Sequence, residues 1–380
     1  MMYPRLRQLT LLVPTKGRAA FLERLLRYYA CEEFPGEIGI ADASTGEEAR
    51  QAERIVEEMS GALRLRYHAY PGLRHDECWK RLNASLATPY VAFLGDDDLL
   101  LPDGLEQCLA FLDDHPTYHA SNGHAALFKL AVPGPYGPMA WVEPYGGVRP
   151  LEQGSAAERL RDHFHQFSVT LFSVHRTAAW QAVWQSSGGT LEWKISTEIL
   201  PGALSVLQGK IRQLPCLYLL RQAHPQQHAN ADSLEWITNP AWQASSDALV
   251  EALTDVLARQ DHLSVPDARA CVRQAWWRHL AKELSQGWRD RYVPQGGSAA
   301  WRRQAGRVPM LRSLWRLRQA WDLGRASLPA LLNPASRHHD AFMTAYEVIS
   351  KPPGKLDRAK RPARSQAASA LVQESLAVPR

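Results

Sequence analysis

The stretch Tyr90-Val-Ala-Phe-Leu-Gly-Asp-Asp-Asp98 decides how this chain is interpreted. Its first five residues are apolar or small and are typical of a buried strand, and three carboxylates follow directly. Side chains alternate between the faces of a strand, so at least two of these carboxylates can reach one site beyond its end. A divalent cation is the usual reason for placing three like charges side by side. The alternative is a solvated acidic turn before a helix near Leu101.

The segments around this stretch alternate between strand and helix patterns. Strands are predicted at residues 9–13, 37–41, 63–67 and 90–94, and helices at residues 21–29, 47–59 and 78–86. The alternation predicts an α/β fold with a mainly parallel, Rossmann-like sheet and flanking helices. Polar breaks follow three of the strands, at residues 14–18, 42–45 and 96–98. Because ligands of such sheets bind at the carboxyl ends of the strands, we expect the three breaks to share one rim.

Four segments, in this order, resemble the nucleotide-binding half of an inverting family 2 glycosyltransferase with the GT-A fold. They are the first strand with its turn, the second strand with its terminal acid, the helix that leads into the fourth strand, and the motif Gly95-Asp-Asp-Asp98. The motif is similar to that of a divergent subgroup of the family. The four segments span roughly residues 8–110, and residues 197–221 resemble the acceptor-side half less closely.

The resemblance implies a metal-dependent glycosyltransferase of the hexosyltransferase type. It would move a sugar from a nucleotide-sugar donor, UDP-linked, to a hydroxyl acceptor, either a glycan or a lipid-linked acceptor, in glycan or polysaccharide synthesis. The residues expected to bind the donor are Pro14, Thr15, Arg18, Asp42, Arg81, Asp96 and Asp97.

The resemblance also implies Mn²⁺ or Mg²⁺. We expect Asp96 and Asp98 as its ligands, because residues two apart on a strand face the same way, with His224 as a third ligand. Aligned literally with the family, the motif selects Asp97 and Asp98 instead.

Inversion requires a base that deprotonates the acceptor hydroxyl as it attacks the anomeric carbon. Glu198, at or near the start of a helix, is the candidate. The alternative for Glu198 is an acid that stabilises the start of that helix through the local dipole. Two other classes remain open for the whole chain. One is a metal-dependent nucleotidyltransferase, and the other is a catalytically inactive scaffold protein that keeps the GT-A fold.

The chain of 380 residues is 45% hydrophobic and 22% charged, which allows a packed core. We predict a GT-A domain at residues 1–240, a basic, Trp-rich helical region at 241–350 and a disordered tail at 351–380. No apolar stretch approaches the ~18 residues that a membrane span needs. The absence of a secretory signal pattern and five scattered cysteines favour a cytoplasmic location.

The segment Met310–Trp321 combines an apolar helical face with Arg312 and Arg316 on the opposite side. A basic amphipathic helix with Trp can lie in a membrane interface, which suggests peripheral contact with the inner face of the cell membrane. The alternative is a helix packed on the catalytic domain. No recognised nucleic-acid-binding motif is present, so no nucleic acid is expected as a partner.

Overall fold

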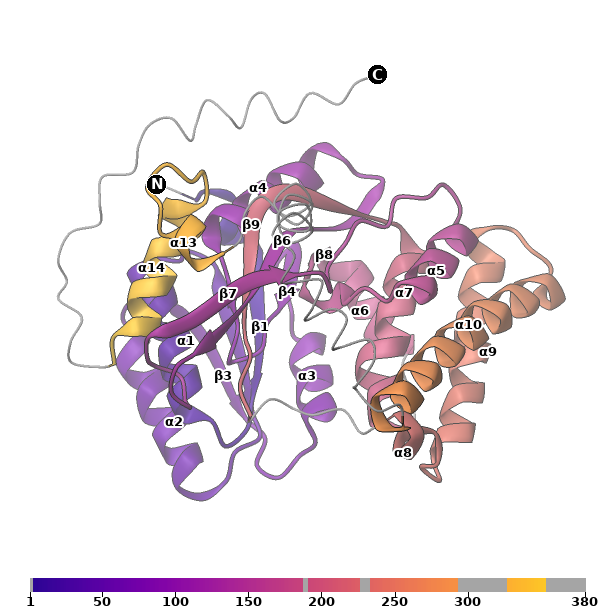
Figure 1. Cartoon of the computed structure of the whole chain (residues 1–380), viewed down its shortest axis with the longest axis horizontal. Helices are drawn as coiled ribbons and strands as arrows, with labels where there is room; N and C mark the ends of the chain where they lie inside the picture. The colour runs from indigo at the N-terminus through magenta and orange to yellow at the C-terminus, as the bar shows by residue number, and fades with distance from the viewer. Residues whose placement is uncertain (1–2, 187–190, 226–232, 293–326, 353–380) are drawn as a thin grey trace.

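The computed structural model describes residues 3–186, 191–225, 233–292 and 327–352 (Figure 1). A short 3₁₀ helix, η1, leads into an alternating first part. Its elements are η1 (Arg5–Gln8), β1 (Leu9–Thr15), α1 (Ala19–Cys31), β2 (Glu37–Asp42), α2 (Gly46–Met59), β3 (Arg64–Ala69), α3 (His75–Ala84) and β4 (Tyr90–Phe93).

The remaining elements complete the sheet and add a helical end. The sheet part continues with β5 (Leu99–Leu100), α4 (Pro102–Asp114), β6 (Tyr118–Leu130), β7 (Met139–Tyr145), α5 (Ala156–His165), η2 (Thr170–Phe172), β8 (Val174–Arg176), α6 (Thr177–Ser186), the π-helical turn η3 (Ile195–Ile199), α7 (Leu200–Gln208) and β9 (Lys210–Gln222). The helices that follow are α8 (Ser233–Ile237), α9 (Trp242–Gln260), α10 (Val265–Tyr292), α13 (Leu328–Leu331) and α14 (His339–Ser350).

In the described residues the strands form one nine-stranded sheet with the order β3-β2-β1-β4-β8-β6-β9-β5, and β7 pairs with β6. The pairings of β3, β2, β1 and β4 are parallel. β8 is antiparallel to both β4 and β6, while β9 is parallel to β6. It follows that β9 points the same way as β1, β2 and β4, so its carboxyl end reaches the same rim. The predicted α/β fold with a mainly parallel sheet is confirmed.

Several predicted boundaries differ from the structure by one to three residues, and the end of the first strand has a clear physical reason. The first strand was expected to end at Val13 because Pro14 follows, but β1 continues to Thr15. The pairing explains the difference. β1 pairs with β4 as far as Leu12, whereas Pro14 and Thr15 pair with β2. Proline is tolerated where no partner strand needs its missing N–H group.

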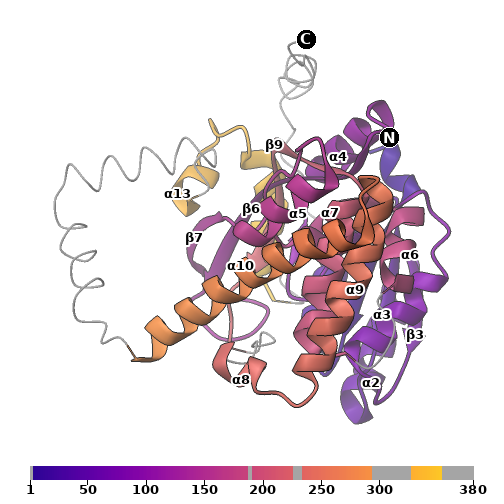
Figure 2. The same ribbon diagram turned by 90° about the vertical axis from the view of Figure 1, so that its right-hand side faces the viewer.

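Helices cover both faces of the sheet. α1, α2 and α14 lie on one side, and α3, α6 and α7 lie on the other (Figure 1). α9 and α10 pack beyond α5 and α7, and form the helical end of the molecule (Figure 2). The predicted boundary at residue 240 stays a prediction. No helix in the described residues is long and apolar enough to cross a membrane. The segment Met310–Trp321 and nearly all of the predicted tail lie outside the described residues.

Buried histidines mark the contact between α5 and α10. His163 on α5 and His279 on α10 both contact the rings of Phe164 and Phe167. His163 is fully buried, and neither of its ring nitrogens has a hydrogen-bond partner among the described residues. Burial disfavours the charged ring and lowers the pKa of His163 to about 3 and that of His279 to about 4.

These pKa values predict a loss of stability in acid. The unfolded His163 has a pKa of about 6.5, so below that pH the unfolded chain takes up a proton that the folded chain refuses. Stability from neutral His163 is therefore complete above about pH 6.5 and is lost as the pH falls towards 3. Linkage sets the loss at about 2 kcal/mol at pH 5. Urea unfolding at about pH 7.5 and about pH 5 measures how far the unfolding free energy falls between these two pH values. In His163→Phe this fall should be smaller by that amount than in the unchanged chain.

The exposed His165 on the same helix provides the matched control. His165→Phe should leave the pH dependence of the unfolding free energy as it is in the unchanged chain. An unchanged pH dependence in His163→Phe would contradict the assignment.

Candidate active site at the carboxyl rim of the sheet

Asp96, Asp97 and Asp98 follow β4 in a tight turn, in which the Asp98 N–H group donates to the Gly95 carbonyl over 3.2 Å. All three are buried, with exposed fractions of 0, 8 and 1%. The solvated acidic turn considered as the alternative is therefore not what the structure contains. Because the strand ends at Phe93, the alternation of side chains along a strand does not govern where these carboxylates point.

Asp96 faces the turn that follows β1. Thr15 Oγ1 donates to Asp96 Oδ2 over 2.7 Å, and Arg18 Nη2 lies 2.5 Å from Asp96 Oδ1. Gly17 between them has a φ of 64°, a left-handed conformation that favours glycine, and its N–H group donates to Ser44 Oγ. Burial raises the pKa of the Asp96 carboxyl to about 7, and the Asp97 charge adds to this although Arg18 opposes it.

Asp97 lies between Arg18 and His224. Its Oδ2 accepts from Arg18 Nη1 over 3.0 Å and lies 2.9 Å from His224 Nε2. Burial opposes ionisation of Asp97, but the hydrogen bond from His224 and the charge of Arg18 outweigh it and lower its pKa to about 2. The His224 ring stacks on Phe21 of α1, with 4.9 Å between the ring centroids.

Asp98 faces the end of β9. Arg221 Nε donates to Asp98 Oδ2 over 3.1 Å, and the Gln222 N–H group donates to Asp98 Oδ1, also over 3.1 Å. Arg221 Nη1 donates to the hydroxyl of Tyr145 on β7 over 2.8 Å. Burial raises the pKa of Asp98 to about 6 and the Asp97 charge adds to it, against the effect of Arg221.

Arg24 of α1 completes the set of cations and was not predicted as a site residue. It is fully buried, and its guanidinium donates to the Asp97 carbonyl over 2.5 Å and also to Gln222 Oε1. Burial lowers its pKa to about 10, which still leaves it charged near neutral pH. The sequence contained a signal for it: Arg24 falls three residues after Phe21 and four before Tyr28, on an apolar helical face.

The other predicted donor-binding residues lie at different places relative to the turn of Asp96–Asp98. Asp42 ends β2 on the same rim, where its oxygens accept from the Ser44 N–H group over 2.7 Å and the Tyr67 hydroxyl over 2.8 Å. Pro14 lies inside β1 beside Thr15. Arg81 is exposed on α3 and lies over the ring of Tyr70, 5.6 Å from its centroid. No described contact joins Arg81 to the turn of Asp96–Asp98.

Glu198 lies in η3, five residues after the helical stretch begins at Trp193, so it is near the start of a helix as expected. Helical residues begin two positions before η3, and Glu192 accepts hydrogen bonds from the N–H groups of Lys194 and Ile195 there. The acid at the helix start is therefore Glu192. Pro201 has no N–H group to donate to the Thr197 carbonyl, which explains a widened turn at this point.

The charges of Glu198 and Asp98 both act on the hydroxyl of Tyr145. Burial raises the pKa of the Tyr145 hydroxyl, Arg221 opposes the rise, and the charges of Asp98 and Glu198 add to it. Glu198 and Asp98 are therefore both close enough to Tyr145 to act on its hydroxyl electrostatically.

The residues fit a cation that is shared with a ligand. Asp97 Oδ1 and Asp98 Oδ2 lie 2.6 and 3.7 Å from the point where a Cβ on Gly95 would sit, so both carboxylates border one small space. Asp96 is turned instead to Arg18. Among the described residues, no three His, Cys, Asp or Glu side chains converge in a way that could hold a metal ion by themselves. Mg²⁺ commonly takes one or two carboxylates and completes its shell with phosphates and water, and this turn suits that mode.

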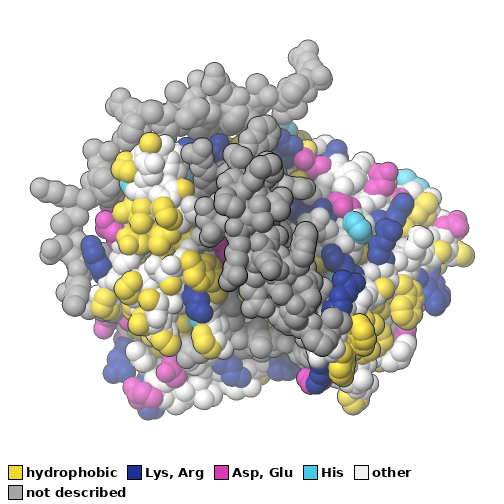
Figure 3. Space-filling model, in the orientation of Figure 1, with side chains coloured by type: hydrophobic (Ala, Val, Ile, Leu, Met, Phe, Trp, Pro, Cys, Tyr) yellow, Lys and Arg dark blue, Asp and Glu magenta, His cyan; other side chains and the backbone are white. Residues whose placement is uncertain are grey.

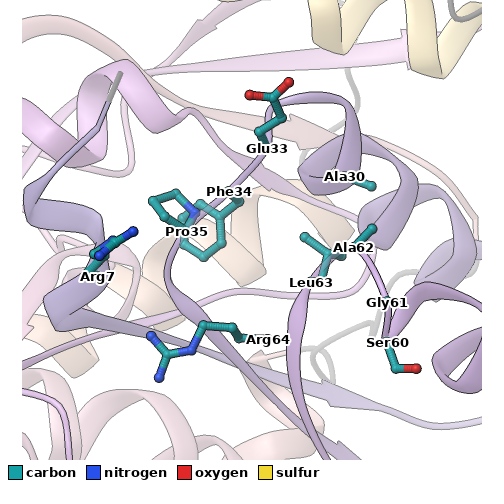
Figure 4. Close-up of a pocket in the computed structure, with 10 residues that line it drawn as sticks. All are labelled: Arg7, Ala30, Glu33, Phe34, Pro35, Ser60, Gly61, Ala62, Leu63 and Arg64. Carbon is teal, nitrogen blue, oxygen red and sulfur yellow. The ribbon is translucent and has the colours of Figure 1, made fainter. Parts of the chain in front are cut away.

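A cavity of about 760 Å³ lies at the opposite end of the strands (Figure 4). Its lining includes Phe34 and Pro35 before β2, Leu63 before β3, and the two cations Arg7 and Arg64. Since these residues precede parallel strands, the cavity is at their amino ends. It is separate from the carboxyl rim that carries the aspartates.

No protein-family model matches the sequence, and no curated protein matches it. Among solved structures, S. aureus TarS, residues 1–349, in complex with UDP-GlcNAc is similar with a TM-score of 0.50 and 15% sequence identity, over 90% of this chain and 89% of that chain. The mannosyltransferase PcManGT from Pyrobaculum calidifontis, in complex with GDP-Man and Mn²⁺, has a TM-score of 0.39 and 14% identity, over 83% of this chain and 84% of that chain. The similarity to TarS shows that the fold is of the GT-A glycosyltransferase type.

The pair of Arg221 and Asp98 predicts a strong effect on stability. Arg221→Gln would leave the buried Asp98 without its cation, which should lower the unfolding free energy by about 3 kcal/mol near pH 7.5. The loss should shrink as the pH falls and Asp98 takes up a proton, because the neutral acid no longer needs a cation. Urea unfolding at about pH 7.5 and about pH 5.5 measures both effects.

Arg212 on the same strand provides the control, since its pair with Glu152 is partly exposed. Arg212→Gln should cost about 1 kcal/mol or less. Equal losses for the two variants would mean that the Asp98 carboxylate does not depend on Arg221.

Proposed function

We propose that this protein is a glycosyltransferase that transfers a sugar from a nucleotide-sugar donor, UDP-linked, to a hydroxyl acceptor with inversion. The observation that carries the proposal is the buried turn of Asp96–Asp98 at the carboxyl rim of a GT-A fold. Arg18, Arg24 and Arg221 surround this turn. Ligands of open α/β sheets bind at this rim, and guanidinium groups are suited to bind phosphates.

The donor-binding role of the rim is supported by the contacts between its turns. Thr15 and Arg18 contact Asp96, and the Thr15 carbonyl accepts from the Ala43 N–H group just after Asp42. A ligand along this rim could therefore contact Asp42 with its base and the turn of Asp96–Asp98 with its phosphates. A carboxylate at Asp42 can accept from the N–H group of a pyrimidine, which supports a uridine donor.

Departure of the nucleoside diphosphate leaves negative charge on its terminal phosphate. Arg18 and Arg221 lie beside the carboxylates and can donate to phosphate oxygens in a buried setting, where such bonds are strong. Asp97 and Asp98 would hold Mn²⁺ or Mg²⁺, which when bound offsets the charge of the leaving diphosphate. This pair is the literal alignment of the motif, and the geometry beside Gly95 favours it over Asp96 with Asp98.

Glu198 is the proposed base. It lies within a π-helical turn, a feature often found at functional sites, and its charge acts on Tyr145 together with that of Asp98. A carboxylate on this side of the aspartates could take the proton from an acceptor hydroxyl that attacks the sugar. His224, held between Asp97 and Phe21, remains a candidate third ligand of the cation.

The identity of the products tests the proposal. With Mn²⁺, UDP-sugars should stabilise the full chain in thermal unfolding and release nucleoside diphosphate slowly. Asp97→Asn and Asp98→Asn should remove the dependence of UDP binding on Mn²⁺ in calorimetry. Release of pyrophosphate from a nucleoside triphosphate would identify a nucleotidyltransferase instead. If the chain neither binds UDP-sugars nor releases a product, it is an inactive scaffold.

The role of Glu198 predicts a separation of binding from turnover. Glu198→Gln should bind UDP with normal affinity but lose two to four orders of magnitude in acceptor-dependent transfer, which is roughly the usual loss on removing a general base. Glu192→Gln is the comparison, because Glu192 is already bound to the N–H groups at the helix start and to Trp236. Its main effect should be on the melting temperature. Near-normal transfer by Glu198→Gln would exclude Glu198 as the base.

A further inference from the structure

α10 exposes an unusual set of aromatic side chains. Trp277, Trp288 and Tyr292 are 58, 54 and 58% exposed. Within the described residues, the exposed large hydrophobic side chains are these three with Leu263, Val265 and Val132, so all but Val132 lie on or just before α10. Large apolar side chains that gather on one surface mark an interaction site more often than single exposed residues do.

The three aromatic residues form one stripe along the helix. At about 100° per residue, Trp288 and Tyr292 lie within about 60° of Trp277 around the axis. The stripe runs from residue 277 to residue 292, fifteen steps along the helix axis, which is about 22 Å. We call Trp277, Trp288 and Tyr292 the aromatic stripe. Figure 3 shows hydrophobic side chains beside Lys and Arg at the helical end of the molecule.

Cations flank the aromatic stripe on both sides. Arg273 lies about 40° to one side of Trp277, while Arg278 and Arg289 lie about 100–120° to the other. All three are exposed. From Arg269 to Tyr292 the sequence has six Lys or Arg residues and two acidic residues, so this part of the helix is clearly cationic.

The opposite face of α10 is fixed to the protein. Ala268, Val272 and Trp276 are buried there, and Trp276 Nε1 donates to Ser246 of α9 over 2.9 Å. α10 also packs on α5 and α8 (Figure 2). The aromatic stripe is therefore presented by a helix whose position is set by its packing, and its exposure is a property of the folded protein.

We propose that the aromatic stripe and its flanking arginines form a docking surface for an anionic lipid bilayer. Trp and Tyr side chains favour the interface between headgroups and acyl chains, and Arg side chains are attracted to anionic headgroups. A helix that lies in the plane of the interface needs this combination of an aromatic face with cationic edges. The proposal concerns where the protein resides, and it does not depend on the chemistry proposed at the turn of Asp96–Asp98.

A second copy of the chain fits this surface less well. Two copies that met through the aromatic stripe would form a symmetric contact, in which each surface meets its own kind. Arg273, Arg278 and Arg289 would then face the same arginines of the other copy, and like charges would be brought together. An anionic bilayer supplies the opposite charge instead.

Sedimentation with lipid vesicles tests the proposal. The full chain should sediment with vesicles of phosphatidylcholine and phosphatidylglycerol at low salt, and much less with phosphatidylcholine alone or at high salt. Trp277→Ala with Trp288→Ala should reduce binding by about tenfold or more, because it removes two of the three interfacial aromatic side chains. Arg273→Gln with Arg278→Gln and Arg289→Gln should reduce binding by about tenfold or more and weaken its dependence on salt.

Matched controls separate this surface from others. The proposal assigns binding to α10 and not to the segment Met310–Trp321, so Trp315→Ala with Trp321→Ala should leave vesicle binding near that of the unchanged chain. Because Trp277 and Trp288 are exposed, their replacement should also leave the melting temperature and the release of nucleoside diphosphate unchanged.

Several results would overturn the proposal. One is failure of the unchanged chain to sediment with anionic vesicles at low salt. Another is binding that survives the changes on α10 but is lost with those at Trp315 and Trp321. A third is a dimer in light scattering that the changes at Trp277 and Trp288 convert to a monomer, which would make the surface a contact between copies.

Discussion

The structure depends on the neutralisation of three adjacent buried carboxylates. Asp96, Asp97 and Asp98 could not remain ionised in the interior without nearby cations, since an isolated buried charge is very costly. The three arginines that surround them come from separate places in the chain: the turn after β1, the helix α1 and the end of β9. The charge requirement therefore fixes how these elements meet at the rim.

This requirement also joins the two parts of the sheet. β4 carries the acidic turn, and β9 is separated from it in the sheet by β8 and β6. β5 follows Asp98 directly and pairs antiparallel with β9, which brings Arg221 and Gln222 to the turn. Gly104 allows α4 to pack closely on β9, because a Cβ at this position would lie 2.7 Å from the Leu217 carbonyl oxygen. α4 can thus approach β9 closely only without a side chain there.

Much of the rim could be predicted from the sequence because it depends on local pattern. Strand ends at Asp42 and Asp96 and the turn around Arg18 follow from apolar runs with polar breaks, and parallel pairing then places them together. Arg221 could not be assigned in this way, since its approach to Asp98 depends on the order of strands that are far apart in sequence. The alternation of side chains along a strand could not predict the orientation of Asp96 either. The chain leaves the strand before the motif begins, so the turn decides which carboxylates share a space.

The charge balance of the turn has a consequence for the proposed chemistry. Three arginines already offset three carboxylates, so a diphosphate alone would bring uncompensated negative charge into a buried region. A diphosphate that arrives with a divalent cation leaves the local charge nearly unchanged. The raised pKa values of Asp96 and Asp98 indicate that burial disfavours the ionised form of these two carboxyl groups. Added positive charge would favour the ionised form. On this argument donor and cation each increase the affinity of the other, as linkage requires of any such coupling. Arg18 and Arg221 would then turn from the carboxylates towards the phosphates, so that their ion pairs with the carboxylates hold the arginines ready for the donor.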